Sequence, residues 1–324
     1  MNRVCDSVKL SELDWQDRTF AIEAFASNEE LHDSLQRCGI LQPPWIWAKP
    51  DGTRIILDGF KRLEWARRAG VERAGGLLFA PESDSAKLLL ARIEVKLFGP
   101  VLNVAERAQI ISRLAPNVPP ETLRSTYLPR LGIAAHPETI QTWCRLAASS
   151  EQLLRAAALE EISERAALEL VDREESAQSE LISLLQELRC SSSIQLEILD
   201  RVKEIALREG SSELEILRDS AVAGMRKDSD RNHREKTQAL RDWLYRRRYP
   251  RIKARQERFV RDLAASNLPQ SVRLVPPPAF EGQSWQLQLH FNSPEKLSRV
   301  LLDLQNFTSS EELKQMMQPK DSAP

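Results

Sequence analysis

The residues best suited to chemistry near the amino terminus are a glycine and two cations at the start of a predicted helix. Asp58 and Gly59 end a short apolar run, and Lys61 and Arg62 follow. A glycine at a helix start leaves backbone N–H groups free, and two neighbouring cations add positive charge, so this turn could hold a phosphate. Basic residues in such a turn are also common as plain surface charge. The spacing alone leaves both interpretations open.

A second set of polar residues surrounds a short predicted helix in the middle of the chain. Gly132 predicts a tight turn, Ile133 and Ile140 are expected to pack a helix pair, and Pro137 predicts the start of the second helix. This pattern resembles the turn and second helix of a DNA-binding helix-turn-helix. However, Pro129 would interrupt the first helix, and the turn is longer than usual. A helical hairpin that does not bind DNA is therefore the alternative. Short hydroxyl and amide side chains and arginine can reach base edges and phosphates. The expected outer face contains His136, Glu138, Thr139, Gln141, Thr142 and Arg145.

Charge is strongly segregated in the second half of the chain. Residues 151–219 carry 17 acidic and 8 basic side chains, whereas residues 226–261 carry 14 basic and 5 acidic ones. A basic stripe with interleaved aromatic residues predicts contacts with a phosphate backbone that are independent of sequence and sensitive to salt. A solvated helix, or one neutralised by the acidic segment, is the alternative. The densest part of the stripe contains Arg246, Arg247, Arg248 and Arg251.

Short strands and helices must position the glycine turn. Apolar runs bounded by turn residues predict strands over 8–13, 45–47, 54–57 and 75–79. Helical spacing predicts helices over 28–38 and 60–69, the first capped by Ser27 or Asn28 and the second ended by Gly70. Residues 85–97 are predicted to be a helix or an apolar connector.

The chain from residue 103 to about residue 208 is predicted to be helical throughout. The apolar period predicts helices over 104–114, from Pro119 onward, over 176–189 and over 193–208. Residues 209–238 are rich in Ser, Asp, Arg and Glu, which predicts a flexible linker. One apolar stripe is expected to contain Leu181, Leu184, Leu185 and Leu188.

The carboxy-terminal part predicts a helix, two strands and a helix. The first helix ends at Ala265, the strands cover 271–275 and 285–291, and the last helix starts at Pro294. Two strands are too few to be stable alone, so pairing with a second copy would complete the sheet and bury the stripe from Leu297 to Leu304. This pattern predicts a twofold homodimer. Residues 309–324 are expected to form a frayed tail.

Composition limits the remaining possibilities. A chain of 324 residues predicts two or three domains, and its net charge of −1 gives no sign of a polyanion partner by itself. The four cysteines lie far apart and only four histidines occur, so no zinc site is expected and the thiols are expected to be reduced. The amino terminus has no apolar core of signal-peptide length, and no segment is apolar enough to span a membrane. We therefore expect a cytoplasmic protein with no membrane partner and no protein-held metal.

Two segments resemble the ParB-type chromosome and plasmid partition family. They are residues 30–43 (ELHDSLQRCGILQP) and 58–70 (DGFKRLEWARRAG). The family carries a Gly-Glu-Arg-Arg box in a ParB/sulfiredoxin-like fold, where it contacts the phosphates of CTP. Gly59 and Arg62 match that box, Lys61 replaces an arginine, and Phe60 stands where the family has glutamate. The resemblance implies a site for CTP with magnesium, formed by Gln42, Pro43, Asp58, Gly59, Lys61 and Arg62.

The family's second nucleotide motif, Glu-Asn-x-Gln-Arg, is not preserved. Registering the chain on residues 103–108 places residues 95–99 there, with Val95 in place of the hydrolytic carboxylate and Gly99 in place of the arginine. A shift of one position would bring Glu94 into the motif. The departure argues against CTP hydrolysis and weakens the case for CTP, so catalysis is not expected, although the sequence does not settle the question.

The resemblance covers nearly the whole chain in the family's order. It implies a mainly α protein with a small α+β ParB/sulfiredoxin-like domain at 1–102, a helical helix-turn-helix domain at 103–208, a linker at 209–238, a basic helix with a small α+β dimerisation domain at 239–308, and a tail at 309–324. The implied function is that of a dimeric, sequence-selective protein that binds double-stranded DNA in partition or nucleoid organisation. It would be nucleoid-associated, and the resemblance also allows nucleotide gating and a partner ATPase.

Two other functions stay open. One is a nucleotide-dependent, kinase-like enzyme on the same amino-terminal fold, for which Asp58 is the nearest carboxylate. A sulfiredoxin-like enzyme would need a reactive cysteine beside the glycine turn, and none occurs between Cys38 and Cys144. The other is an adaptor that binds protein rather than DNA. Loss of ATP turnover on Asp58→Ala would favour the enzyme.

Overall fold

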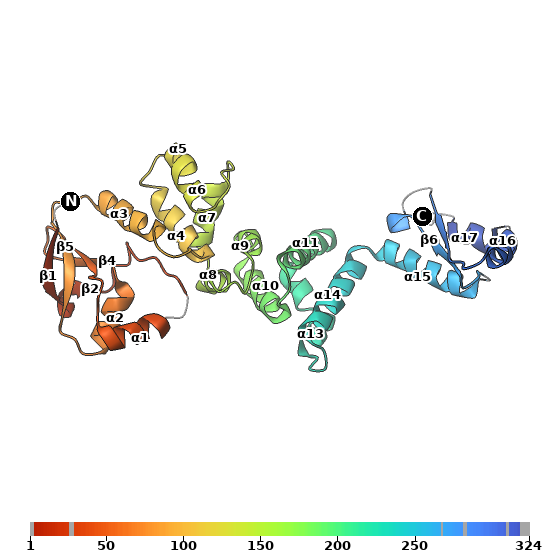
Figure 1. Ribbon diagram of the computed structural model, residues 1–324, viewed down its shortest axis with the longest axis horizontal. Coiled ribbons are helices and arrows are strands. Elements are labelled where there is room, and N and C mark those ends of the chain that lie inside the picture. Colours follow the sequence, from red (N-terminus) through yellow and green to blue (C-terminus); the bar gives the residue numbers. More distant parts are fainter. Residues whose placement is uncertain (1–2, 26–28, 267, 281–283, 309–310, 318–324) are drawn as a thin grey trace. The chain divides into compact units, whose positions relative to one another are not determined.

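Five short strands near the amino terminus form one mixed sheet (Figure 1). Its order is β1-β5-β3-β4-β2, in which β3 runs antiparallel to β4 and parallel to β5. β1 pairs antiparallel with β5, and β2 pairs parallel with β4. The strands are β1 (Arg3–Lys9), β2 (Leu13–Asp14), β3 (Trp45–Ala48), β4 (Arg54–Asp58) and β5 (Arg73–Phe79).

The computed structural model describes residues 3–25, 29–266, 268–280, 284–308 and 311–317. The chain divides into two units, residues 1–237 and 238–324. The described residues are mostly helical, and the mixed sheet lies at the start of the first unit. The expected cap of the first helix, at Ser27 or Asn28, lies outside the described residues.

The prediction of a strand over residues 8–13 is wrong. The strand is β1, and a 3-10 turn, η1 (Leu10–Glu12), follows it before β2. Val8, Leu10 and Leu13 are all buried. In an extended strand Leu13 would face away from the other two, because alternate residues point to opposite faces. The turn at η1 breaks the alternation, and all three side chains can enter the core.

Helices on the sheet complete the first domain. α1 (Glu29–Cys38), α2 (Phe60–Arg68) and α3 (Ser85–Leu97) match their predicted positions closely. The first two pack against each other, and the third packs against β4. Ile46 and Ile56 of the sheet and Leu63 and Ala66 of α2 are fully buried in one cluster. This cluster fixes the start of α2 against the end of β4.

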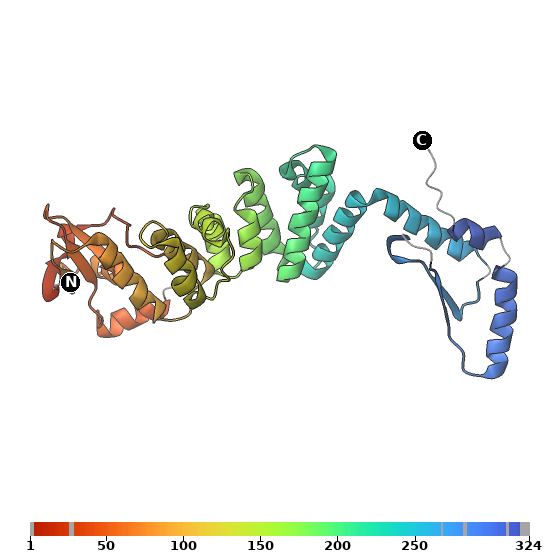
Figure 2. The same cartoon turned by 90° about the horizontal axis from the view of Figure 1, so that it is seen from above.

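A run of helices follows in the first unit. α10 and α11 confirm the predicted helices at 176–189 and 193–208 to within one residue at each end, and the predicted leucine stripe on α10 is buried. α12 packs against both α10 and α11 (Figure 2, green to teal). The helices from residue 104 to residue 217 are α4 (Val104–Leu114), α5 (Pro120–Thr122), α6 (Leu128–Arg130), α7 (Thr139–Ala147), α8 (Glu151–Ala158), α9 (Glu164–Leu170), α10 (Glu175–Leu188), α11 (Ser192–Glu209) and α12 (Glu213–Leu217).

Pro129 does not interrupt the helix before the glycine turn. Residues 120–130 are continuously helical because a π-helical segment, η2 (Leu123–Tyr127), joins α5 to α6. In the wider turn, the backbone N–H of Leu128 donates to the carbonyl of Leu123. Pro129 then lies in the first turn of α6, where a missing N–H costs little.

The prediction of a flexible linker at 209–238 is also wrong. This segment contains α12, α13 (Ser220–Lys227) and the start of α14 (His233–Arg248). Val222 is 2% exposed, and Arg226 pairs with Glu180 and Glu187 of α10. The polar residues that predicted a linker instead form helix caps and this ion-pair cluster.

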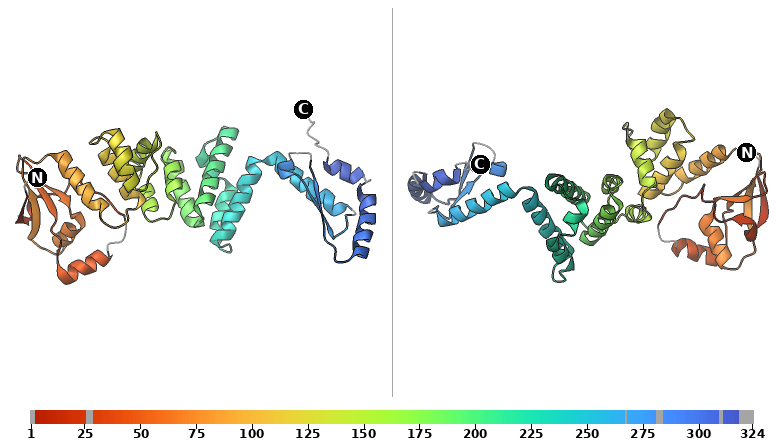
Figure 3. Two further views of the ribbon diagram at one scale, coloured as in Figure 1. Left: turned by 45° about the horizontal axis from the view of Figure 1, so that its top comes forward. Right: turned by 180° about the vertical axis from the view of Figure 1, so that it is seen from behind.

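The second unit contains a two-stranded sheet among helices (Figure 3). β6 (Val272–Val275) pairs antiparallel with β7 (Gln286–Leu289), and the η3 turn (Pro278–Phe280) lies between them in the chain. α15 (Pro250–Ala265) packs against η3 and α17 (Glu311–Met317), and α16 (Pro294–Thr308) follows β7. The expectation of a frayed tail is wrong for α17, because Met316 is buried in the core of the unit.

The apolar stripe on α16 is divided between the interior and the surface. Leu304 is buried inside its own unit together with Phe307, so it does not need a second copy to cover it. Leu301 is the exposed member of the predicted stripe, at 47%, whereas Leu297 and Val300 are half-buried. Leu302, next to the stripe, is 66% exposed.

Candidate functional site

The turn between β4 and α2 is built around a glycine that no other residue could replace without strain. Gly59 has φ +88°, in the left-handed region, and a Cβ added there would lie 2.8 Å from the Cβ of Pro44. The strand before it pairs with β3 through a register shift between Trp45 and Ile46. Such a bulge changes the direction of a strand end. The backbone thereby places the Asp58 side chain beside the start of α2.

Asp58 holds two guanidinium groups. One carboxylate oxygen accepts from Arg62 of α2 and the other from Arg92 of α3, both at 2.8 Å. Arg62 also donates to the backbone carbonyl of Gln42. All three charged side chains are largely buried. A carboxylate shared in this way is a counter-ion for the two arginines, and it is poorly placed to act as the base of a kinase-like enzyme.

Arg92 is the residue of this cluster that the sequence did not reveal. Burial lowers the pKa of its guanidinium, and the Asp58 carboxylate opposes that shift. Its Nε lacks a hydrogen-bond partner within the described part of the chain. A signal did exist, because Arg92 falls in the buried stripe of α3 with Leu88, Leu89 and Ile93, where an arginine needs an anion. An additional acceptor at this place would satisfy the buried Nε.

A cavity of about 280 Å³ opens at this cluster. Asp58, Gly59, Lys61 and Arg62 line it, as predicted, whereas Gln42 and Pro43 do not. Gln42 reaches the cluster only through its carbonyl. The cavity has an excess of positive charge, which suits a phosphate or another small polyanion. Its charged lining residues are Arg18, Glu23, Asp58, Lys61, Arg62, Glu64, Arg92 and Lys96.

Helix α4 anchors the loop that forms one wall of the cavity. The Gln109 side chain accepts from the backbone N–H of Glu23 at 2.8 Å and donates to its carbonyl at 2.9 Å. Asn103 donates to the carbonyl of Ala24 at 2.6 Å. Arg113 donates to two further carbonyls of this loop. The cavity is therefore fixed from both sides, by α2 and α3 on one and by α4 on the other.

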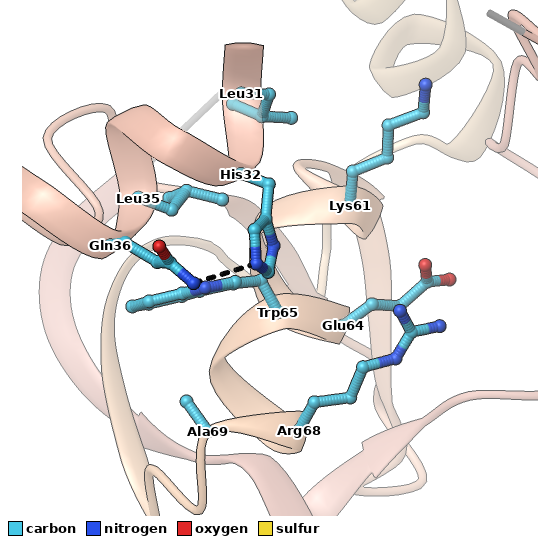
Figure 4. Close-up of a pocket in the computed structure, with 9 residues that line it drawn as sticks. All are labelled: Leu31, His32, Leu35, Gln36, Lys61, Glu64, Trp65, Arg68 and Ala69. Carbon is cyan, nitrogen blue, oxygen red and sulfur yellow. Dashed lines mark hydrogen bonds between the residues drawn. The ribbon is translucent and has the colours of Figure 1, made fainter. Parts of the chain in front are cut away.

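A second cavity of about 320 Å³ lies between α1 and α2 (Figure 4). Its apolar lining is Leu31, Leu35, Trp65 and Ala69, and Leu31, Lys61 and Glu64 also line the first cavity. His32 and Gln36 are joined by a 3.0 Å hydrogen bond over Trp65. An apolar group could enter here next to the charged cavity.

Glu94, the one carboxylate that could have restored the family's hydrolytic motif, points elsewhere. Its two oxygens accept from Arg130 of α6 at 2.9 and 2.8 Å. The Arg130 hydrogen bond lowers the pKa of Glu94. Arg130 also lies over the rings of Phe98 and Tyr127. Glu94 therefore ties α3 to α6, the helix that precedes the turn at Gly132.

Helix α7 is anchored from below and presents polar groups outward. Trp143 and Leu146 are buried, and α7 packs against α4. Arg107 of α4 lies over the Trp143 ring at 5.2 Å. His136, Gln141 and Arg145 are exposed. These three predicted residues lie along one side of the helix and the turn before it, whereas Ile140 is only half-buried.

Two of the predicted DNA-reading hydroxyls are engaged by the backbone. The Thr139 hydroxyl accepts from the N–H of His136 and donates to the carbonyl of Ala134, both at 3.0 Å. These bonds close the turn, and the helix begins at Thr139 rather than at Pro137 as predicted. The Thr142 hydroxyl donates to the carbonyl of Glu138 at 3.1 Å. Thr139 thus shapes the turn in this structure.

The predicted basic stripe ends α14 and begins α15. Within the second unit, Arg247 lies over the Trp243 ring at 5.0 Å and Arg248 over the Tyr249 ring at 4.8 Å. Arg246 and Arg251 are exposed, and Pro250 starts the next helix. Aromatic stacking holds two guanidinium planes in place and leaves their charge at the surface.

Two searches of the described residues bear on other kinds of site. No group of three His, Cys, Asp or Glu side chains in the described ranges is placed to hold a metal ion. No helix in that part of the chain combines the length and apolar character that crossing a bilayer requires.

Comparison with known proteins gives likenesses to ParB structures. No protein-family model matches the chain. No curated protein matches it either. Among solved structures, the chain is similar to C-terminally truncated ParB from Caulobacter crescentus in complex with the centromeric parS site, at 18% identity and a TM-score of 0.30, over 60% of this chain and 99% of that one.

Two further structures are similar. The same Caulobacter protein in complex with CTP-γ-S matches at 20% identity and a TM-score of 0.23, over 56% of this chain and 98% of that one. A Pnob8-like ParB-N domain matches at 12% identity and a TM-score of 0.38, over 76% of this chain and 99% of that one. All three likenesses are to ParB structures, at TM-scores below 0.5.

Proposed function

We propose that this chain is a ParB-like protein that binds double-stranded DNA sequence-selectively, in DNA partition or nucleoid organisation. The observation that carries the proposal is the outer face of α7. Trp143 and Leu146 fix the helix on α4, while His136, Gln141 and Arg145 extend into solvent. Amide, imidazole and guanidinium groups on one side of an anchored short helix can hydrogen-bond to base edges in a major groove.

The basic stripe supports the same proposal. Arg246 and Arg251 are exposed beside the stacked Arg247 and Arg248. Four guanidinium groups on consecutive helices suit a phosphate backbone, which contributes affinity without sequence information. The acidic segment at 151–219 would be repelled by the same polymer, so it is expected to face away from bound DNA.

Fluorescence anisotropy with genomic fragments and random duplexes, at about 0.15 M salt, tests the DNA proposal. We expect Arg145→Ala to lower the affinity for a selected fragment about tenfold or more. Arg155→Ala, on the exposed side of α8, is the matched control and should leave that affinity unchanged. If every fragment binds no more tightly than random duplex, α7 is not a reading helix.

We infer further that the second unit forms a homodimer. The described residues of this unit form a two-stranded sheet. Leu287 of β7 and Phe291 are 43% and 55% exposed, and Leu301 and Leu302 of α16 are exposed to similar degrees. Apolar side chains of this size on so small a sheet favour a second copy as cover. Sedimentation equilibrium tests the inference, with Leu302→Glu expected to weaken the dimer. Leu207→Glu, at a 75% exposed position on α11, is the control. A monomeric wild-type chain would contradict the inference.

We infer that the cavity beside Gly59 holds the phosphates of a nucleotide, with CTP and magnesium as the first candidate. Lys61, Arg62, Arg92 and Lys96 would hold them, because all four line the cavity. A bound nucleotide would add negative charge between α2 and α3. Without a carboxylate of the family's hydrolytic motif in the cavity, we propose binding rather than hydrolysis.

Isothermal titration with CTP, ATP and GTP in magnesium buffer, with and without DNA, tests this inference. Lys61→Ala should weaken whichever nucleotide binds, because its ammonium group lines the cavity. Lys87→Ala, at an exposed position near the start of α3, removes a similar charge outside the cavity and is the control. No heat with any of the three nucleotides at millimolar concentration would mean that the turn is only a scaffold.

A further inference from the structure

Arg145, the cation on the proposed reading face, is held by a carboxylate from outside its own helix. Its Nη1 lies 3.0 Å from an oxygen of Asp172, and its Nη2 donates to the Thr142 hydroxyl at 3.3 Å. Asp172 lies in the turn between α9 and α10, and packing of α7 against α9 brings this turn to the reading helix. Without DNA, the guanidinium therefore already has an anionic partner.

The surface beside this pair is anionic. A cleft of about 510 Å³ lies among α7, α12 and the turn that precedes α10. Three cations line it: Arg145, Arg173 and Lys203. Arg173 is already paired with Glu213, so its charge does not offset the other carboxylates of the cleft. A phosphate backbone that approached α7 from this side would be repelled. The carboxylates of the cleft are those of Glu138, Glu169, Asp172, Glu174 and Glu213.

The Arg145–Asp172 pair is weak enough for Arg145 to exchange Asp172 for a contact with DNA. The two side chains are 42% and 60% exposed, and an exposed ion pair changes an equilibrium by no more than about fivefold. A single phosphate offers Arg145 an ion pair of the same kind, so the exchange gains little. A bidentate contact between arginine and a guanine edge is worth about five- to a hundredfold, and it exceeds the pair that is lost.

We propose that Asp172 is an intramolecular competitor of DNA for Arg145. It holds the guanidinium and lowers the affinity of the protein for every duplex that Arg145 would contact. Asp172 touches no DNA itself and acts through Arg145. The proposal rests on the DNA-binding role of α7 given above. It differs from that role in predicting a loss of charge, at Asp172, that makes the protein bind DNA more tightly.

The test is Asp172→Asn in the full-length protein, with two probes of about 24 bp. One probe has a random sequence, and the other is the duplex that enrichment from a randomised pool returns for the wild type. We expect affinity for both probes to rise about two- to fivefold, because Arg145 no longer has to leave an anionic partner in order to contact DNA. The plot of log K against log salt for the random probe should steepen by about 0.9, because the freed Arg145 neutralises one more phosphate.

Three matched variants separate this role from a structural one. Asp172→Glu keeps the charge and should restore the wild-type values. Glu169→Gln removes a charge from the same cleft, and no ion pair joins Glu169 to Arg145 in the described part of the chain, so the salt slope should not change. In a background of Arg145→Ala, Asp172→Asn should have no effect on either probe. A residue that merely supported α7 would lower both affinities and leave the slope alone.

The results that overturn the proposal are distinct from failure of the DNA-binding role. If the wild type selects a site but Asp172→Asn leaves both affinities and the salt slope unchanged, Asp172 does not compete with DNA for Arg145. If the wild type returns no enriched duplex at all, α7 is not a reading helix and both proposals fall.

Discussion

The cavity beside Gly59 and the outer face of α7 both display arginines, but they hold them in opposite ways. Arg62 and Arg92 are buried and share one carboxylate, whereas Arg145 is half-exposed and has a weak, replaceable partner. Buried charges are expensive to leave unpaired, while exposed ones are not. Substitutions in the cavity should therefore change the free energy of unfolding. Substitutions on the α7 face should change DNA affinity alone.

The sharpest way to test this difference is to remove the shared carboxylate. Asp58→Ala leaves two buried guanidinium groups without their anion, so we expect the free energy of unfolding of the first unit to fall by about 4 kcal/mol. Urea unfolding followed by tryptophan fluorescence measures this. Glu12→Gln removes the partner of Arg54 at a more exposed pair and should cost less than about 1 kcal/mol. Equal losses would mean that the Asp58 cluster is not a buried network.

Gly59→Ala is expected to have the next largest effect. A left-handed backbone disfavours a Cβ by about 1 to 2 kcal/mol, and contact with Pro44 at 2.8 Å raises the total to about 3 kcal/mol. Gly52→Ala is a close control, because Gly52 has φ +85° but its added Cβ would meet no atom within 4 Å. It should lose only about 1 kcal/mol. Similar losses for the two variants would show that the turn tolerates movement of Pro44.

The same contrast explains how far the sequence alone could lead. Local signals were sufficient for the glycine turn, for α2 and for the leucine stripe of α10, since each depends on spacing within a few residues. Arg92 was missed because its partner, Asp58, lies 34 positions earlier in the chain, and nothing local couples them. The wrong linker has a similar cause. Arg226 reaches α10 across about 40 residues, so a polar segment that looked unstructured is packed as helices.

On the α7 face, local signals predicted several residues that the structure exposes, but not the contacts that the others make. Thr139 belongs to the predicted outer set, yet its hydroxyl closes the turn through the backbone of His136 and Ala134. Asp172 was absent from the prediction because only the tertiary packing of α7 on α9 brings it to Arg145. A helix face can be read from periodicity, whereas its counter-ions come from elsewhere in the chain.

Gln141→Ala tests the exposed side of the comparison. The side chain is exposed on α7, so the free energy of unfolding should change by less than about 0.5 kcal/mol. Affinity for a selected duplex should fall about tenfold, because a glutamine that contacts adenine bidentately contributes on that scale. Urea unfolding and anisotropy on the same preparation separate the two. A loss of stability without a loss of affinity would place Gln141 in the fold rather than at the interface.

The smallest expected effect lies where the two regions meet, at Glu94 and Arg130. The Arg130 hydrogen bond lowers the pKa of Glu94 below its ordinary value of 4.5. A lowered folded-state pKa contributes stability that is present above the ordinary pKa and is lost as the pH falls through the folded one. Because Glu94 is 37% exposed, the free energy of unfolding of the wild type should exceed that of Glu94→Gln by less than about 1 kcal/mol near neutral pH.

That difference should shrink toward zero as the pH falls through the lowered pKa of Glu94, because protonation then removes the same charge in the wild type. Urea unfolding at about pH 7 and about pH 3 measures it. Glu121→Gln is the control, since Glu121 is 85% exposed in its pair with Arg124 and should show no difference at either pH. A difference that persisted in acid would mean that Glu94 stabilises the junction by its shape. In that case α3 and α6 would be held together by packing rather than by this ion pair.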